Sequence, residues 1–168
     1  MNCLSLGAAG KGPADWTNLD ADPANGPDIV ARVPPLPDEV KHTVWDRIEM
    51  IHFIEHLHQW EADELLEQLY GVLRPGGLLV LEQPNIEYCA RVLLGLESAP
   101  PGPASAFGLW GFYGDPRSQN PLMTHRWGYT PQSLEEALVK AGFERERIVH
   151  GPARQHSALR DFRIEAVK

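Results

Sequence analysis

Short apolar runs separated by turn residues dominate the first third of the chain, and they predict β-strands. Residues 3–6 form the first run and lead into a glycine-rich turn at 7–12. Further strands are expected at 16–22, 29–33 and 44–53, where hydrophobic residues again gather between breakers. Runs of this length are typical of strands that are buried on both faces, as in a parallel sheet.

Two segments follow the helical period instead. From Trp60 onward the apolar residues recur three or four positions apart, and the proline and two glycines of residues 74–77 are expected to end this helix in a turn. Its apolar stripe consists of Ala62, Leu65, Leu66, Leu69, Tyr70 and Leu73. A continuous apolar strand is expected at 78–82. A second helix is expected to begin after Thr130, which is followed by proline, and to end at Gly142.

The last third of the chain contains one exceptional segment and two further candidate strands. Strands are expected at 144–150 and 159–167, and in the second of these apolar residues alternate with charged ones, as in a strand with one wet face. Residues 96–128 combine prolines and glycines with aromatic residues, too apolar for a disordered linker and too broken for a regular element. We expect this segment to be a long irregular loop, either a lid over a binding site or a covering of the sheet.

Composition narrows the classes of partner. The chain has 168 residues with a formal net charge of −8, which disfavours nucleic acid because phosphate binding needs a basic surface. No apolar run approaches the roughly 20 residues that cross a bilayer. The N-terminus lacks the basic region and cleavage site of a signal peptide. The cysteines, Cys3 and Cys89, are expected to be buried thiols, which favours a cytoplasmic location. Together with the charge and the short apolar runs, this predicts a protein with no membrane or nucleic-acid partner.

The first two strands together suggest a nucleoside site. In the glycine-rich turn, main-chain N–H groups can approach a ligand closely. Asp20, at the tip of the second strand, can accept hydrogen bonds from the two ribose hydroxyls. Asp22, just before a proline, is expected to cap or bend the following loop instead.

Several motifs in order along the chain resemble one family. They are Leu6-Gly7-Ala8-Ala9-Gly10, Asn18-Leu19-Asp20, Trp45-Asp46-Arg47-Ile48, His52-Phe53-Ile54-Glu55-His56-Leu57, Leu73-Arg74-Pro75-Gly76-Gly77 and His125-Arg126-Trp127-Gly128-Tyr129. This series is similar to the class I S-adenosylmethionine-dependent methyltransferases, and most of all to their small branch of predicted methyltransferases. The resemblance covers nearly the whole chain, and its most specific part is the His-x-x-Glu-His-Leu segment followed by Leu-Arg-Pro-Gly-Gly.

The resemblance implies an α/β fold. We expect a Rossmann-like, mostly parallel central sheet with an antiparallel C-terminal strand, helices on both faces and a reduced N-terminal crossover. Residues 1–168 would form a single methyltransferase-like domain, with 96–128 as a lid or insertion loop. The implied activity is methyl transfer from S-adenosylmethionine to a small-molecule acceptor, with a sugar-like acceptor suggested by the branch alone.

The resemblance also implies roles for individual residues. Those expected to bind the cofactor are Gly7, Ala8, Ala9, Gly10, Asp20, Ile51 and His52, with the turn along the methionyl and ribose portion and the last two beside the sulfonium. Those expected to act as bases are His52 and His56. Those expected to meet the acceptor are Gln83, Asn85, Tyr113 and His125.

The chain departs from the branch in three places. Ala8 and Ala9 replace a cysteine and a glycine in the turn, and Arg32 stands where the branch commonly has an acid near the adenine. Too few residues separate Gly10 from Trp16 for the usual crossover helix. These departures leave open a second possibility, a degenerate, non-catalytic module that binds a nucleoside weakly or serves as an interaction module.

The segment His52-Phe53-Ile54-Glu55-His56 also matches an inverted zinc-peptidase pattern. On a helix, His52 and His56 would be ligands on one face and Glu55 a base. The segment directly follows a predicted strand, however, and no downstream carboxylate is marked as a further ligand. We therefore expect no metal.

Overall fold

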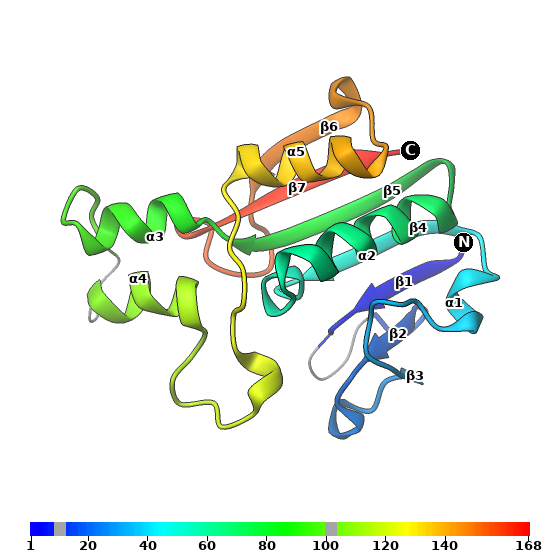
Figure 1. Cartoon of the computed structure of the whole chain (residues 1–168), viewed down its shortest axis with the longest axis horizontal. Helices are drawn as coiled ribbons and strands as arrows, with labels where there is room; N and C mark the ends of the chain where they lie inside the picture. Colours follow the sequence, from blue (N-terminus) through cyan, green and yellow to red (C-terminus); the bar gives the residue numbers. More distant parts are fainter. Residues whose placement is uncertain (9–12, 100–103) are drawn as a thin grey trace.

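Seven strands join in one sheet in the order β3-β2-β1-β4-β5-β7-β6 in the computed structural model, which describes residues 1–8, 13–99 and 104–168 (Figure 1). The strands are β1 (Cys3–Leu6), β2 (Thr17–Asp20), β3 (Ile29–Val30), β4 (Trp45–Ile51), β5 (Leu73–Pro84), β6 (Ile148–Pro152) and β7 (Asp161–Val167). Strands β1 to β5 are parallel to one another, whereas β7 runs antiparallel to β5 and β6. The expected mostly parallel Rossmann-like sheet with an antiparallel C-terminal strand is confirmed.

The helices are α1 (Asp38–Lys41), α2 (Gln59–Val72), α3 (Ile86–Leu93), α4 (Ala104–Tyr113) and α5 (Pro131–Ala141). Both helices that the apolar periodicity predicts, α2 and α5, are present. The stripe of α2 is buried as expected at Ala62, Leu65, Leu66 and Leu69. At α5 the hydroxyl of Thr130 accepts from the backbone N–H of Ser133, and Gly142 ends the helix with φ +117°. No helix among the described residues is long and apolar enough to cross a membrane.

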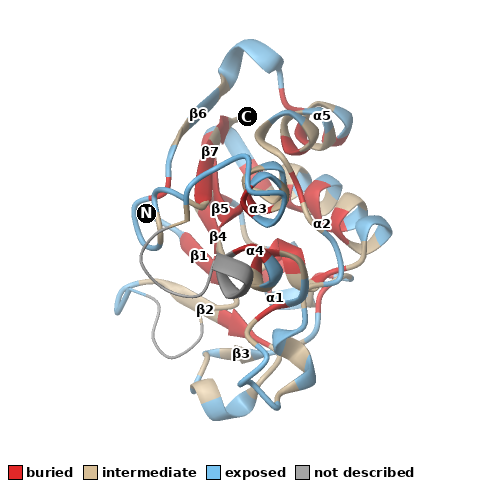
Figure 2. Ribbon diagram, turned by 90° about the vertical axis from the view of Figure 1, so that its left-hand side faces the viewer, coloured by how far each residue is buried: buried red, intermediate tan, exposed pale blue. Residues whose placement is uncertain are grey.

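The two faces of the sheet differ in chemistry. One row of paired residues, Leu4, Ile48, Leu79 and Ala166, lies in the hydrophobic core. The next row, Ser5, Glu49, Val80 and Glu165, points to the other face because successive side chains alternate. We expected helices on both faces; in the described part of the chain α1, α2 and α5 all lie on the apolar side, and α3 and α4 lie beyond the carboxyl ends of the strands (Figure 2).

The crossover between β1 and β2 is short, as predicted. Only residues 7–16 connect these two parallel strands. The strands still pair in register, with Leu4 opposite Thr17 and Leu6 opposite Leu19. A backbone bond from Gly7 N to Leu19 O, 2.8 Å long, continues the pairing past the end of β1 and fixes where the turn begins.

Residues 74–77 belong to strand β5 and do not form the expected turn. Strand β5 begins at Leu73, immediately after α2, and its pairing with β4 shifts register between Trp45 and Arg47. The backbone groups in this irregular stretch are not released to solvent: Gly76 N donates to Lys168 O and Lys168 N donates to Gly77 O. Pairing with the C-terminal residue therefore outweighs the local preference of proline and glycine for a turn.

Residues 96–128 were expected to form an irregular loop, but this segment contains the helix α4. This helix packs on α3, a helix that the sequence analysis also missed, as it missed α1. The glycines that suggested a broken segment allow this packing. A Cβ on Gly111 would lie 2.3 Å from Cys89 Sγ, and one on Gly108 would lie 2.6 Å from Leu93 Cγ. Close helix contact, and not chain reversal, is the physical role of both glycines.

Candidate active site

The carboxyl ends of the parallel strands and the segments that follow them surround a cavity of about 230 Å³, here called the first cavity. It is lined by Gly7, Asp20, Ala21, Asp22, Asn25, Ala31, Arg32, Val33, Pro34, His52, Phe53, His56, Leu57, Glu61, Asn120, Leu122, Met123 and Arg126. Gly7 has φ +68°, and a Cβ there would lie 2.2 Å from Phe53 Cδ2. Only glycine fits this position, so the turn after β1 can lie against the loop that follows β4.

The carboxylate of Asp20 lies in this cavity at the tip of β2. Its Oδ1 accepts from Asp22 N at 2.8 Å and its Oδ2 accepts from Asn25 Nδ2 at 2.9 Å. A carboxylate oxygen can accept more than one hydrogen bond, so Asp20 keeps capacity for a ligand. Asp22 caps the following turn, as expected: its oxygens accept from Ala24 N and from Asn120 Nδ2.

Another part of the first cavity's wall is formed by the chain after β3. Arg32 is exposed and lines the cavity beside Ala31, Val33 and Pro34. A guanidinium only donates hydrogen bonds, so Arg32 offers no acceptor to a purine amino group. This residue therefore remains a departure from what the family resemblance leads one to expect.

A second cavity of about 670 Å³ adjoins the first. It is lined by Ser5, Leu6, Gly7, Ala8, Pro13, Glu49, Ile51, His52, His56, Trp110, Asp115, Met123, His125, Gln155, His156 and Arg160. Gly7, His52, His56 and Met123 line both cavities. The two cavities therefore meet at these four residues.

His52 lies at this junction with both ring nitrogens engaged. Its Nε2 is 3.0 Å from Asp161 Oδ2 and its Nδ1 is 3.0 Å from Glu55 Oε1. Its backbone has φ +51° and is held by a 2.8 Å bond from His52 N to Glu82 O. Burial lowers the pKa of His52, but the two carboxylates outweigh burial and raise the pKa to about 9. A protonated ring with both nitrogens occupied acts as a fixed positive charge, not as a base.

His156 lies against His52, with ring centroids 4.1 Å apart. Burial and the charge on His52 lower the pKa of His156, so its ring is neutral near pH 7. The loop that carries it is anchored by Glu82, a fully buried carboxylate of β5. Glu82 accepts from Arg154 N at 2.9 Å, from Gln155 N at 3.0 Å and from Arg163 Nη1 at 2.7 Å.

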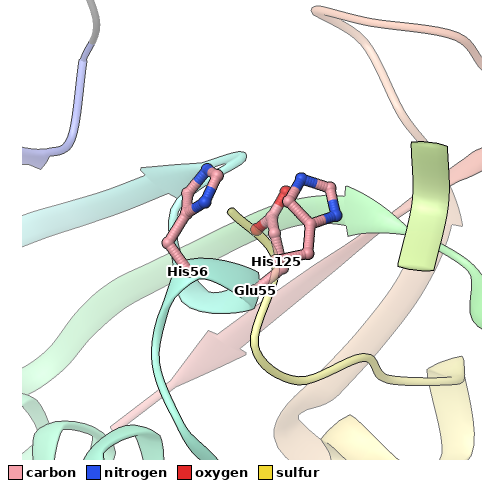
Figure 3. Close-up of side chains that lie close together, drawn as sticks. All are labelled: Glu55, His56 and His125. Atoms are coloured by element: carbon pink, nitrogen blue, oxygen red, sulfur yellow. The ribbon is translucent and has the colours of Figure 1, made fainter. Parts of the chain in front are cut away.

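The rings of His56 and His125 contact each other edge to face at the second cavity, with centroids 5.0 Å apart. The His125 Nδ1 lies 2.9 Å from Gly111 O and the His56 Nδ1 lies 3.2 Å from Thr124 O. A carbonyl only accepts, so each Nδ1 carries the proton and each Nε2 keeps its lone pair in the neutral ring. Burial lowers the pKa of His125, which favours that neutral form. Figure 3 shows the two rings with the carboxylate of Glu55 beside His125.

Most of the predicted site residues that the structure describes come together here. Gly7, Ala8, Asp20, Ile51, His52, His56 and His125 line one or both cavities, with Ala8 and Ile51 on the second and not on the first. Ala9 and Gly10 lie outside the described residues. Three predicted acceptor contacts line neither cavity. Gln83 is buried within β5, Asn85 Oδ1 caps α3 through Glu87 N, and Tyr113 is largely exposed on α4.

Other lining residues were not found from the sequence. His156 and Arg160 belong to the loop between β6 and β7, and Asn120 belongs to the segment after α4. A topological signal existed for the first two. Because β7 is antiparallel to β5, its first residue pairs with Pro84 at the carboxyl end of β5. The loop before β7 must therefore reach the edge of the sheet where the site lies.

A model of the methyltransferase-domain family matches residues 5–148. The chain belongs to this family. Its fold is that of the class I S-adenosylmethionine-dependent methyltransferases, and S-adenosylmethionine is its cofactor, as the sequence motifs led us to expect.

Solved structures agree with this fold. The methyltransferase has a TM-score of 0.63 and 18% identity to an S-adenosylmethionine-dependent methyltransferase from Archaeoglobus fulgidus, covering 99% of this chain and 86% of that one. It has a TM-score of 0.63 and 12% identity to a possible histamine N-methyltransferase from Thermotoga maritima, covering 99% and 82%. It has a TM-score of 0.60 and 16% identity to a plantazolicin methyltransferase in complex with S-adenosylhomocysteine, covering 99% and 75%. A comparison with curated proteins finds no match.

Proposed function

We propose that this methyltransferase binds S-adenosylmethionine in the first cavity and transfers its methyl group to a small molecule in the second. The observation that carries the proposal is the junction of the two cavities at Gly7, His52, His56 and Met123. Transfer requires the acceptor atom to lie in line with the methyl group at close range. Two adjoining cavities that share one wall supply that arrangement.

The residues of the first cavity fit the cofactor. The buried Asp20 carboxylate can accept from ribose hydroxyls. Gly7, a position where only glycine fits, lets the backbone approach the ligand. Val33, Phe53 and Leu57 offer apolar surface to a planar base. When bound, S-adenosylmethionine supplies an electrophilic methyl group. The segment 96–128 contributes Asn120, Leu122 and Met123 to this wall, which supports its proposed role as a lid.

His52, which the sequence analysis named as a base, takes a positioning role in this proposal. Its charge is held by Asp161 and Glu55 at the junction of the cavities. His156 is the better base, because its ring is neutral and faces the second cavity. S-adenosylmethionine would supply its methyl group to the acceptor's heteroatom, with the bonding electron pair staying on sulfur, and His156 would take the acceptor's proton.

The lining of the second cavity favours a polar, hydroxyl-rich acceptor. Glu49, Asp115, Gln155 and Arg160 provide hydrogen-bonding groups, and Trp110 provides a flat apolar surface. Such a mixture suits sugar-like molecules. The net charge of −8 supports a small-molecule acceptor over a nucleic acid. Both cysteines are buried free thiols, which supports the proposed cytoplasmic location.

A methyl-transfer experiment tests this proposal. The purified full chain is incubated with methyl-labelled S-adenosylmethionine and a cell extract that has been separated into small molecules, proteins and nucleic acids. We expect label in the small-molecule fraction, and much less transfer by the Asp20→Ala variant at a cofactor concentration that does not saturate it. Label in either macromolecular fraction would overturn the acceptor class. Failure of the protein to bind S-adenosylhomocysteine in calorimetry would overturn the enzyme proposal itself.

Arg32 favours a second candidate, a non-catalytic nucleoside-binding or interaction module. It lines the first cavity where the resembled branch commonly places an acid, and it can only donate hydrogen bonds. The same calorimetry discriminates the two candidates, because a module of this kind would bind the nucleoside weakly and would transfer no label to any fraction.

A further inference from the structure

Glu55, His56 and His125 bring three metal-ligating groups together at the edge of the second cavity. One oxygen or nitrogen atom from each side chain lies within 4.8 Å of the other two. Glu55 and His56 come from the 3₁₀ turn after β4, and His125 comes from the segment that follows α4 (Figure 3). The set differs from the inverted zinc-peptidase pattern, because both ring nitrogens of His52 face carboxylates, Glu55 and Asp161, and the third group comes from far along the chain.

The two imidazoles are prepared as ligands by their hydrogen bonds. Each Nδ1 faces a backbone carbonyl, Thr124 O for His56 and Gly111 O for His125. A metal-bound histidine usually donates its other ring N–H to a carbonyl or a carboxylate, which fixes the tautomer and the direction of the ring. Both rings already have this arrangement, with the Nε2 lone pair left for a cation.

Glu55 provides an independent observation. Its side chain is 2% exposed, its Oε1 lies 3.0 Å from His52 Nδ1, and its Oε2 has no hydrogen-bond partner among the described residues. The His52 ring is itself shared with Asp161. Buried carboxylates are normally satisfied by donors or by a metal ion. The remaining capacity of Glu55 therefore points to a cation.

The backbone holds the two segments in a fixed relation. Arg126 N donates to Glu55 O at 2.8 Å, so the residue after His125 is tied to Glu55 itself. A bound ion lies about 2.0–2.2 Å from each nitrogen or oxygen ligand, which places the ligand atoms roughly 3–3.5 Å apart. The present separations of up to 4.8 Å exceed that spacing, so the three side chains would move closer together on binding an ion.

We propose that Glu55, His56 and His125 bind a divalent first-row transition-metal ion, such as Mn²⁺ or Zn²⁺, that holds a hydroxyl oxygen of the acceptor. Two imidazoles with one carboxylate favour these ions over Mg²⁺ and Ca²⁺, which prefer oxygen ligands. Three protein ligands leave coordination positions for water and for the acceptor.

The role of the ion rests on the proposed function. His56 lines both cavities and His125 lines the second, so the ion would lie on the acceptor side of the junction. A metal-bound hydroxyl loses its proton more readily, and the resulting oxygen is a better nucleophile toward the methyl carbon. The C–S bond breaks as the C–O bond forms, the electron pair stays on sulfur, and the hydroxyl proton passes to His156. The site thus narrows the acceptor to an alcohol or a vicinal diol.

Metal binding is measured on the chelator-treated full chain by titration with Mn²⁺, followed by electron paramagnetic resonance, and with Zn²⁺ by calorimetry. We expect one ion per chain. Loss even of an outer partner of a ligand typically weakens metal binding 10–100-fold, so His56→Gln and His125→Gln should each weaken it by at least about tenfold. His42→Gln is the control, because His42 is exposed at the end of α1 and lines neither cavity.

Saturable binding that His56→Gln and His125→Gln leave unchanged, or that His42→Gln removes equally, would overturn the site. Pulsed resonance of the Mn²⁺-loaded wild type keeps the test sharp if a variant fails to fold: coupling to two histidine nitrogens is expected, and its absence overturns the proposal.

Calorimetry with S-adenosylhomocysteine on the metal-free chain separates this site from the proposed function. Nucleoside binding without any metal binding would reject the metal site alone. Metal binding without nucleoside binding would reject the proposed function.

Discussion

The two cavities meet at one wall but are built in different ways. The first is assembled from the ends of consecutive parallel strands, with Gly7 after β1, Asp20 on β2 and His52 after β4. The second gathers residues from distant segments, among them His125 and the loop that carries His156. The comparison shows that the first cavity follows from the sheet order itself, whereas the second cavity depends on long-range anchors that sequence motifs do not reveal.

The buried pair of Glu82 and Arg163 anchors the loop that lines the second cavity, and it gives the largest expected effect. Arg163→Ala leaves a fully buried carboxylate without its charged partner. Removing one member of a buried pair typically costs about 3–5 kcal/mol. We expect a loss of this size in the free energy of unfolding, measured by urea denaturation.

Arg74→Ala is the matched control, because Arg74 forms an exposed ion pair with Asp46 on the same sheet. A much smaller loss of stability is expected there, since exposed pairs contribute little. Equal losses in the two variants would mean that Glu82 is not a special support of the second cavity.

The first cavity is tested by Asp20→Ala. Its carboxylate lies at a strand tip and accepts from ribose in the proposal, and hydrogen bonds to charged acceptors contribute about 1.5–3 kcal/mol. We expect calorimetry to show S-adenosylhomocysteine binding weakened by that amount, with the melting temperature nearly kept. Asp22→Ala should weaken binding less, because its oxygens serve Ala24 N and Asn120. The reverse order would move the ribose contact to Asp22.

The amino-acid pattern predicts the first cavity and the sheet well, for a physical reason. Buried strands and the helices α2 and α5 leave regular apolar patterns, and the ends of parallel strands meet at one edge. The turn glycine and Asp20 can therefore be placed together from the sequence alone.

The second cavity resisted prediction because its contacts are tertiary. Nothing local shows that Glu82 accepts two backbone N–H groups from residues 72 and 73 positions away, which is what brings His156 to His52. The helix α4 was not predicted because glycines in a sequence usually indicate a loop. Their role in close helix packing is visible only in the structure, where they lie against Cys89 and Leu93. Asn85 directly follows β5, and Tyr113 is the last residue of α4. Their positions along the chain gave no information on where their side chains would point.

The same anchor makes stability depend on pH. Burial raises the pKa of Glu82, but the N–H groups of Arg154 and Gln155 and the Arg163 guanidinium outweigh burial and hold the pKa below its usual value. The folded state therefore binds fewer protons than the unfolded state just below about pH 4.5. The stability that ionised Glu82 contributes is complete above that pH and is lost as the pH falls through the lower pKa of Glu82 in the folded state.

We expect the free energy of unfolding of the wild type to fall on acidification below about pH 4.5. In Glu82→Gln the slope should be smaller by up to one proton, about 1.4 kcal/mol per pH unit. Urea denaturation at a series of pH values measures both slopes. Identical slopes would show that Glu82 is not the group that couples the fold of the second cavity to protons.

The smallest expected effect concerns Arg32, the residue of the first cavity that departs from the family resemblance. If the base of the nucleoside lies against the chain after β3, Arg32→Asp supplies the missing acceptor for its amino group, and one hydrogen bond is worth roughly 0.5–1.5 kcal/mol. We expect tighter binding of S-adenosylhomocysteine by that amount in calorimetry, and no gain in Arg32→Ala, which removes the charge without adding an acceptor. Equal gains in both variants would assign the effect to charge. A loss in both, with the fold intact, would show that Arg32 itself holds the ligand, and that this end of the first cavity recognises something other than the amino group.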